Sequence, residues 1–242
     1  MPASEAGVPA GGAPVIVIPA LNAAATLPAV LWRLREVLPA APVVVVDDGS
    51  DDATSAVAKN HGAFVVWLTL TEGKGRALAA GVRAALARGA SAVVTMDADG
   101  QHPAECVPAL LAPLTTGLAD IVVGARRRGD GPMPWARRCT NWLSSALVSR
   151  ALGLRVPDSQ SGFRAFTRRV AETVRPSDAR YEFETEFLFQ AARAGFRIAA
   201  VPVPTVYGGA ASHFRYGADT MRLSRVFLRH WRAIAFGPPP RT

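Results

Sequence analysis

Cysteine is scarce in this chain and long apolar runs are missing. Cys106 and Cys139 are the only cysteines among 242 residues, too few and too scattered to indicate a disulfide framework or a zinc site. No run reaches the 18 or more apolar residues that a membrane-spanning helix needs. The start of the chain has no basic segment followed by an apolar one, so we expect no signal peptide. These absences predict a cytoplasmic protein without a transmembrane helix.

Two common phosphate-binding motifs are missing as well. The chain contains neither Gly-x-Gly-x-x-Gly nor the Walker lysine motif. The segment Gly73-Lys74-Gly75 is too short to be a P-loop, and a flexible turn before a helix explains it equally well. Lys74 can nevertheless reach a phosphate group from this position.

The composition predicts one well-packed domain with short tails. Half of the residues are apolar and 19% are charged, so the chain can bury a sizeable core. Neither the length nor the pattern requires a second domain. We expect a disordered tail at residues 1–13, one domain at 14–216, an amphipathic helix at 217–236 and a tail at 237–242.

A surplus of positive charge points to an anionic partner. The formal net charge is +8, which suits nucleic acid, an anionic membrane surface or a phosphorylated small molecule. The arginines gather in two stretches: Arg126, Arg127, Arg128, Arg137, Arg138 and Arg150, then Arg215, Arg222, Arg225, Arg229 and Arg232. Most of the second stretch falls in the predicted helix at 217–236. That helix either lies flat on an anionic bilayer or packs on the sheet, and its pattern fits both.

Strand-like and helical patterns alternate along the chain. Apolar, mostly β-branched runs of strand length stand at 15–18, 43–46, 64–70, 93–96 and 121–124. Helical patterns lie between them at 26–38, 52–60, 75–87 and 103–115. Further on we expect a helix at 135–152, a short strand within 158–166, three alternating acids before a helix that carries Phe187, and a strand at 198–203. This order predicts right-handed βαβ units and an α/β fold with a mostly parallel sheet.

The clearest chemical signal is a pair of acids at the end of a predicted strand. Asp97 and Asp99 follow the run at 93–96 directly, and Gln101 comes two residues later. Ligands of open α/β sheets bind outside the carboxyl ends of the strands. Two carboxylates this close repel each other unless a cation lies between them, and a divalent cation with oxygen ligands serves that purpose. The alternative is an acidic turn that caps the following helix.

Two further classes of protein compete on these residues alone. A phosphatase with Asp97 as nucleophile is one, because Asp-x-Asp-Gly at a strand end also occurs in haloacid dehalogenase-like enzymes. Their acids follow the first strand, however, and a threonine usually comes next. A non-enzymatic binding module is the other, but the acidic set and the missing RNA-binding aromatic motif argue against nucleic acid.

Five motifs in one order resemble a known family. They are VIVIPALN at 15–22, VDDGS at 46–50, GKGRAL at 73–78, MDADGQHP at 96–103 and DSQSGFRAF at 158–166. Together they resemble the family 2 glycosyltransferases, and most of all the dolichol-phosphate mannosyltransferase group, whose members load a polyprenyl phosphate with a sugar. The resemblance implies a GT-A fold, a nucleotide-sugar donor of the GDP-mannose or UDP-glucose type, Mg²⁺ or Mn²⁺, and inversion at the anomeric carbon.

The resemblance also assigns residues. Donor contacts are implied for Pro19, Leu21, Asn22, Asp48, Lys74, Asp97, Arg126, Arg138, His213 and Arg215. The implied metal ligands are Asp97, Asp99 and Gln101, and the candidate catalytic residues are Asp99, Asp158, Arg164 and Glu184. Related chains commonly carry an acid just after the asparagine, where this chain has Ala23 and Ala24. The choice of nucleotide therefore stays open.

The acceptor decides whether a general base is needed. A lipid phosphate is already ionised and needs none, whereas a hydroxyl must lose a proton to a carboxylate. Asp158, Glu182 and Glu184 are the candidates for that base, and a loop cap or an ion pair with Arg164 or Arg180 is the alternative explanation for each of these acids. The arginine-rich segments favour a polyprenyl phosphate met at the inner face of the cytoplasmic membrane. An acceptor with a saccharide or other hydroxyl is the remaining alternative.

Overall fold

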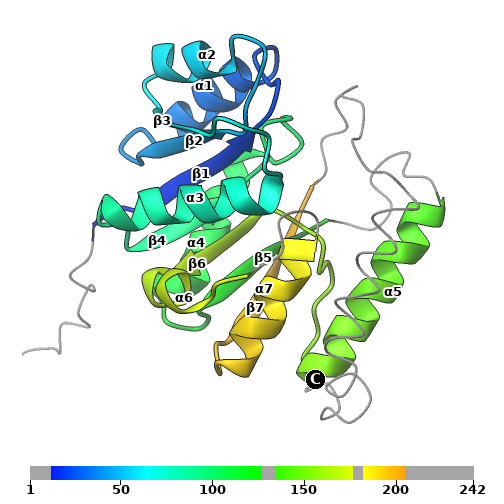
Figure 1. Ribbon diagram of the computed structural model, residues 1–242. Helices are drawn as coiled ribbons and strands as arrows, with labels where there is room; N and C mark the ends of the chain where they lie inside the picture. The colour runs from blue at the N-terminus through cyan, green and yellow to red at the C-terminus, as the bar shows by residue number, and fades with distance from the viewer. Residues whose placement is uncertain (1–11, 127–134, 177–181, 205–242) are drawn as a thin grey trace, which may run out of the picture.

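The computed structural model describes residues 12–126, 135–176 and 182–204 (Figure 1). The predicted helix at 217–236, the tail after it, His213 and Arg215 lie outside these residues. So does the predicted N-terminal tail up to residue 11. Arg138 lies in a described helix, but its side chain is outside the description.

In the described residues, seven strands form one sheet. They are β1 (Val15–Ala20), β2 (Val43–Asp47), β3 (Phe64–Trp67), β4 (Ala92–Thr95), β5 (Ile121–Arg126), β6 (Arg164–Thr167) and β7 (Ile198–Val203). Their order across the sheet is β3-β2-β1-β4-β6-β5-β7. Strand β6 runs antiparallel to β4 and β5, and the other pairs are parallel. The predicted α/β fold with a mostly parallel sheet is confirmed.

Helices cover both faces of this sheet (Figure 1). They are α1 (Leu27–Val37), α2 (Thr54–Asn60), α3 (Lys74–Ala87), α4 (Val107–Thr115), α5 (Trp135–Leu152), α6 (Arg168–Thr173) and α7 (Glu182–Arg193), with a 3-10 turn η1 at Ala104–Cys106. Residues of α3, α6 and α7 pack on one face, and residues of α1, α2 and α4 pack on the other. No helix in the described part of the chain is long and apolar enough to cross a membrane.

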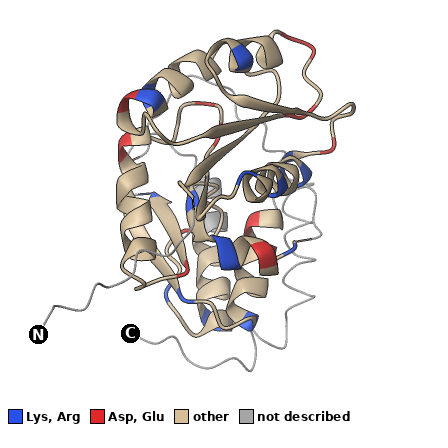
Figure 2. Cartoon of the chain, turned by 90° about the vertical axis from the view of Figure 1, so that its left-hand side faces the viewer, with Lys and Arg blue, Asp and Glu red and all other residues tan. Residues whose placement is uncertain are grey.

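Strand β1 shows why the central strands are continuous apolar runs. Val15 and Val17 belong to the core beneath α3, α6 and α7, whereas Ile16 and Ile18 belong to the core beneath α1 and α4. All four side chains are at most 1% exposed. A strand covered on both faces has no solvent side that would call for polar residues. The strands accordingly carry little charge along their length (Figure 2).

Two of the differences between predicted and observed boundaries have a clear physical reason. Strand β3 ends at Trp67 instead of residue 70, because β2, its only strand neighbour among the described residues, ends at Asp47 opposite Trp67. Helix α7 begins at Glu182, so the three alternating acids lie within the first turns of the helix and not before it. Carboxylates near a helix N-terminus are stabilised by the unpaired amide groups there, which suits this start.

The strand order places a crevice at one edge of the sheet. Strands β1, β2 and β4 are parallel, so their carboxyl ends meet at this edge. Strand β2 lies on one side of β1 and β4 on the other, so the strand order reverses between β1 and β4. A reversal of this kind is where open α/β sheets bind their ligands.

Candidate functional site

Several strand ends deliver polar residues to this edge. Strand β4 leads into the segment that carries Asp97 and Asp99, directly beside the end of β1. Strand β6 starts opposite the end of β4, with Arg164 paired to Thr95, so the segment 158–163 arrives at the same edge. Strand β5 ends there with Arg126, because it runs antiparallel to β6. The topology thus gathers motifs that are far apart in the sequence.

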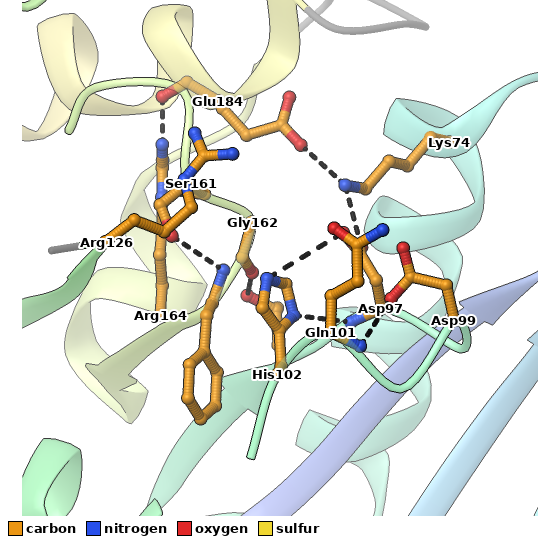
Figure 3. A network of polar contacts seen from close by, with 12 residues as sticks. Lys74, Asp97, Asp99, Gln101, His102, Arg126, Ser161, Gly162, Arg164 and Glu184 are labelled. Atoms are coloured by element: carbon orange, nitrogen blue, oxygen red, sulfur yellow. Dashed lines mark hydrogen bonds and ion pairs between the residues drawn. The ribbon is translucent and has the colours of Figure 1, made fainter. Parts of the chain in front are cut away.

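A lysine between two carboxylates forms the centre of the site. Lys74, the first residue of α3, places Nζ 2.7 Å from Oδ1 of Asp97 and 3.1 Å from Oε1 of Glu184 on α7 (Figure 3). The Glu184 side chain is 3% exposed, whereas those of Lys74 and Asp97 are 24% and 28% exposed. Two negative charges therefore share one positive charge in a largely enclosed position.

The pKa values follow from this arrangement. Burial opposes the charged form of Lys74, but the carboxylates of Asp97 and Glu184 outweigh it and raise the pKa of the lysine. Burial likewise opposes the charged form of Asp97, but the charge and the hydrogen bond of Lys74 outweigh it, so the pKa of Asp97 falls to about 2. Lysine and aspartate are therefore both charged at neutral pH.

Gly162 closes the site from the side of the segment 158–163. A Cβ at this position would lie 2.8 Å from Nζ of Lys74 and 3.4 Å from Oδ1 of Asp97, so a larger residue would force the lysine ammonium to shift. Thr95 donates a hydrogen bond of 2.7 Å from Oγ1 to the carbonyl of Gly162 and fixes the backbone there. The sequence motif contained Gly162, but its role depends on contacts that no local pattern reveals.

The second acid lies in a tight turn. Oδ1 of Asp99 accepts a hydrogen bond of 2.9 Å from the backbone N–H of Gln101. Gly100 between them has φ +77°, a conformation that glycine adopts without strain. Figure 3 shows Asp97, Asp99 and Gln101 on one short stretch of chain. The three residues predicted to bind a metal ion thus lie together.

His102 supports this turn, a role that the sequence did not reveal. Its Nδ1 accepts a hydrogen bond of 3.0 Å from the backbone N–H of Asp97. Its ring stacks on Phe163 with a centroid distance of 4.9 Å and an interplanar angle of 11°. Burial lowers the pKa of His102 against the pull of the Asp97 charge, which favours the neutral ring that this hydrogen bond requires. Only its place within the motif at 96–103 pointed to His102.

Arg126 and Asp158 form a two-pronged ion pair beside the centre. Nε of Arg126 lies 2.6 Å from Oδ2 of Asp158, and Nη2 lies 3.0 Å from Oδ1. Burial opposes the charged form of Asp158, but the hydrogen bonds and charge of Arg126 lower its pKa. The structure thus shows Asp158 in an ion pair whose partner is Arg126, a residue that the sequence did not suggest for it.

Arg164 is buried and bonded to backbone carbonyls. Its guanidinium donates to the carbonyls of Ser161 (2.7 Å), Ser159 (2.9 Å) and Glu184 (2.7 Å). Burial lowers the pKa of Arg164 to about 10 against the pull of the Glu184 and Asp158 charges. The residue is 3% exposed, and its hydrogen bonds tie the segment 158–163 to helix α7.

Two predicted donor residues that follow strands β1 and β2, Asn22 and Asp48, accept hydrogen bonds from backbone N–H groups. Oδ1 of Asn22 accepts a hydrogen bond of 2.9 Å from the backbone N–H of Asp51. The carboxylate of Asp48 accepts the N–H groups of Glu72 (2.8 Å) and Gly73 (2.9 Å), which fixes the turn that leads to Lys74. Pro19 lies in β1, and Leu21, 43% exposed, follows it at the same edge.

The acidic turn suits a hard divalent cation. Asp97 and Asp99 offer carboxylate oxygens and Gln101 an amide oxygen, the ligand types that Mg²⁺ and Mn²⁺ take. No group of three or more His, Cys, Asp or Glu in the described residues forms a metal cluster by itself. Mg²⁺ is commonly held by one or two carboxylates together with substrate phosphates, so two acids are sufficient for a cation bound with a diphosphate. The lysine ammonium on Asp97 shows that this oxygen already attracts a cation.

The chain is an α/β protein with an acidic site where the strand order of the sheet reverses. Its sequence also shows which family it belongs to. Residues 15–175 match the family described as Glycosyl transferase family 2. The chain therefore belongs to the family 2 glycosyltransferases, which confirms the resemblance drawn from its motifs.

Curated relatives and a solved structure narrow this further. The undecaprenyl-phosphate mannosyltransferase of Micrococcus luteus is 37% identical over 204 residues, which are 78% of this chain and 82% of that protein. The polyprenol monophosphomannose synthase of Mycolicibacterium smegmatis is 32% identical over 201 residues, 78% of this chain and 76% of that protein. Glucosyl-3-phosphoglycerate synthase from Mycobacterium tuberculosis, solved with Mn²⁺, UDP and glucosyl-3-phosphoglycerate, is similar with a TM-score of 0.74 and 26% identity. That match covers 91% of this chain and 80% of the solved chain, and the fold is GT-A-like.

Proposed function

We propose that this glycosyltransferase moves a sugar from a nucleotide sugar of the GDP-mannose or UDP-glucose type to a polyprenyl phosphate. The names of the relatives from Micrococcus luteus and Mycolicibacterium smegmatis support this acceptor. The observation that carries the proposal is that the described candidate bases are held in ion pairs. Asp158 is paired with Arg126 and Glu184 with Lys74, which suits an acceptor that has no proton to lose.

The proposed reaction needs no base. A phosphate oxygen of the acceptor forms a bond to the anomeric carbon, while the bond from that carbon to the nucleoside diphosphate breaks. The electron pair of the broken bond leaves with the diphosphate, and attack from the opposite side inverts the anomeric carbon. Asp97, Asp99 and Gln101 would hold a divalent cation, which would supply positive charge to stabilise the leaving diphosphate.

The chain's own residues bind and orient the two substrates. In this proposal Asn22 and Asp48 shape the donor edge of the crevice, with Pro19 and Leu21 beside them. Arg126, at the end of β5, contributes charge toward the phosphates, because one cation can serve Asp158 and an incoming anion together. Arg138, His213 and Arg215 complete the donor contacts as predictions from the sequence. Asp158 and Arg164 hold their segment in place and take no part in proton transfer.

Peripheral membrane contact belongs to the same proposal. A polyprenyl acceptor lies in a bilayer, so the enzyme has to meet a membrane surface. The basic helix predicted at 217–236 suits an anionic surface of this kind. Residues 217–236 lie outside the described part of the chain, so their sequence alone supports contact with a membrane.

A hydroxyl acceptor is the second candidate. The Mycobacterium tuberculosis synthase with this fold was solved with glucosyl-3-phosphoglycerate, which is not a lipid phosphate. For this acceptor class a carboxylate among Asp158, Glu182 and Glu184 would have to take a proton. For the two whose side chains the structure describes, Asp158 and Glu184, that requires breaking an ion pair.

Release of nucleoside diphosphate tests the proposal. Purified protein would receive UDP-glucose or GDP-mannose with polyprenyl phosphate and either Mg²⁺ or Mn²⁺. We expect release that needs the lipid phosphate and the metal ion and is lost in Asp99→Ala. Release that proceeds equally without the lipid phosphate but rises with a hydroxyl acceptor would contradict the proposed acceptor. No release and no binding of either donor would contradict the donor class.

A further inference from the structure

Lys74 occupies one oxygen of the proposed metal site. Its Nζ lies 2.7 Å from Oδ1 of Asp97, which is direct contact between an ammonium and a carboxylate oxygen (Figure 3). A divalent cation bound at the same oxygen would lie within about 2.0–2.6 Å of it. Two cations this close to one oxygen repel each other strongly. A metal ion therefore cannot bind this oxygen of Asp97 while Lys74 stays in its present position.

The lysine supplies a charge that the site needs in the metal-free protein. Without it, Asp97 and the buried Glu184 would be two carboxylates without a shared counter-charge. Removing one partner of an enclosed ion pair leaves an uncompensated charge, which is strongly unfavourable. Lys74 thus does for the metal-free site what a divalent cation would do for the loaded one.

Glu184 offers the lysine a second place to bind. The side chain of Glu184 is 3% exposed, and its Oε2 has no hydrogen-bond partner among the residues described. Its backbone is fixed, because Arg164 donates a hydrogen bond of 2.7 Å to its carbonyl. An ammonium carries three N–H donors, so Lys74 can leave Asp97 and still be bonded to Glu184.

We propose that Lys74 competes with the divalent cation for Asp97, and that Glu184 is the partner that holds Lys74 when the cation takes its place. Glu184 is then a positioning residue and acts through Lys74 without touching substrate or metal ion. This inference rests on the proposed metal role of Asp97. It assigns Lys74 a role before the donor binds, which is separate from any contact between the lysine and a donor phosphate.

The affinity for Mn²⁺ alone, without donor or acceptor, tests the competition. Free Mn²⁺ is measured by its electron paramagnetic resonance signal, and binding lost in Asp97→Ala defines the site. Lys74→Met removes the competitor and is expected to tighten binding by about tenfold, within the usual range of coupling between two sites. Glu184→Gln leaves the lysine with Asp97 alone and is expected to weaken binding severalfold.

Two control variants test whether Lys74 and Glu184 act through their contacts in the site or only through the net charge of the protein. Arg76→Met removes the same charge from the same helix, at an exposed residue paired with Glu72. Glu72→Gln is the corresponding control for Glu184→Gln. Both controls are expected to leave the Mn²⁺ affinity within about twofold of the unsubstituted protein, because exposed charges are screened by water and salt.

The double variant Lys74→Met/Glu184→Gln shows whether Glu184 acts through the lysine. The proposal predicts that Glu184→Gln has no effect on Mn²⁺ affinity once Lys74 is methionine. This variant also removes the buried Glu184 charge that Lys74→Met alone would leave unpaired, so it keeps the test valid if Lys74→Met alone folds poorly. Independent, multiplicative effects of the two substitutions would overturn the role of Glu184.

The outcomes separate this inference from the proposed function. Binding of Mn²⁺ that depends on Asp97 and tightens without Lys74 supports both. Binding that depends on Asp97 but does not tighten in Lys74→Met or in the double variant overturns the competition and leaves the metal site intact. No Asp97-dependent binding in any of these proteins overturns the competition, whereas the metal site itself is contradicted only if Asp97-dependent binding is also missing after UDP is added.

Discussion

Thr95 donates a hydrogen bond of 2.7 Å from Oγ1 to the carbonyl of Gly162, across 67 positions of sequence. Thr95 ends strand β4, and Gly162 stands just before strand β6. The bond holds the glycine backbone beside Lys74 and Asp97, where a larger residue would displace the lysine ammonium. This single contact thus links the sheet to the enclosure of the proposed metal site.

Thr95→Val is expected to destabilise the protein and to loosen this enclosure. Valine keeps the shape but leaves the Gly162 carbonyl without its donor at a buried position, which costs about 1–3 kcal/mol. The free energy of unfolding from urea titration measures the effect. Thr116→Val is the control, because Thr116 also donates to a carbonyl but is exposed. An equal loss in the two variants would contradict the importance assigned to the buried bond.

Gly81→Ala is expected to destabilise although alanine favours helices. Gly81 lies in α3, and a Cβ there would come within 2.3 Å of Cγ1 of Val17 and 2.9 Å of Cγ2 of Val46. Overpacking of this kind costs about 1–3 kcal/mol, more than the roughly 1 kcal/mol that helix propensity returns. Arg83→Ala on the exposed side of α3 is the control. Thermal or urea unfolding decides the sign, and a stabilised Gly81→Ala would show that α3 is not packed this closely on β1.

Arg164→Lys is expected to lower stability by about 2–4 kcal/mol, because lysine cannot reach three separate carbonyls and leaves buried acceptors unpaired. Arg168→Lys, at an exposed position on α6, serves as the control and is expected to change stability by less than about 0.5 kcal/mol. Urea unfolding measures both. A stability of Arg164→Lys equal to that of the control would indicate that the charge alone matters at this position.

Asp158→Asn is expected to cost stability near neutral pH but not in acid. The pKa of Asp158 is lowered in the folded state, so its contribution is present above the ordinary value of 3.8 and is lost as the pH falls through the folded-state value. At pH 7 the loss should be about 3 kcal/mol, since the substitution leaves Arg126 facing a neutral partner. Unfolding free energies measured from pH 7 down to pH 3 should therefore converge with those of the unsubstituted protein. Glu172→Gln, which breaks an exposed pair with Arg168, should show a small difference throughout.

The strands of the sheet and the acidic turn could be predicted from the sequence, because both depend on residues that are close together in the chain. Apolar runs of strand length are covered on both faces, so they appear as runs without polar residues. Asp97, Asp99 and Gln101 stand within one motif, and a turn brings such residues together whatever surrounds them.

The partners of these residues could not be predicted in the same way. Glu184 was predicted as a candidate base, but its ion pair with Lys74 depends on how α3 and α7 pack. Asp158 was expected to face Arg164 or Arg180 if it formed an ion pair, yet strand β5 delivers Arg126 to it. The order of the strands in the sheet decides which charged residues meet at its edge, and the spacing of residues along the chain does not predict that order.

The identity of the sugar product tests the central claim most directly. Protein with Mn²⁺ and a donor labelled in its sugar would receive either polyprenyl phosphate or the matching polyprenol, which differs only in lacking the phosphate. The account predicts that label enters the lipid fraction as a sugar joined to polyprenyl phosphate, with the configuration at its anomeric carbon inverted, and that polyprenol gives none. Label transferred equally well to polyprenol, or recovered only on a water-soluble hydroxyl acceptor, would contradict it.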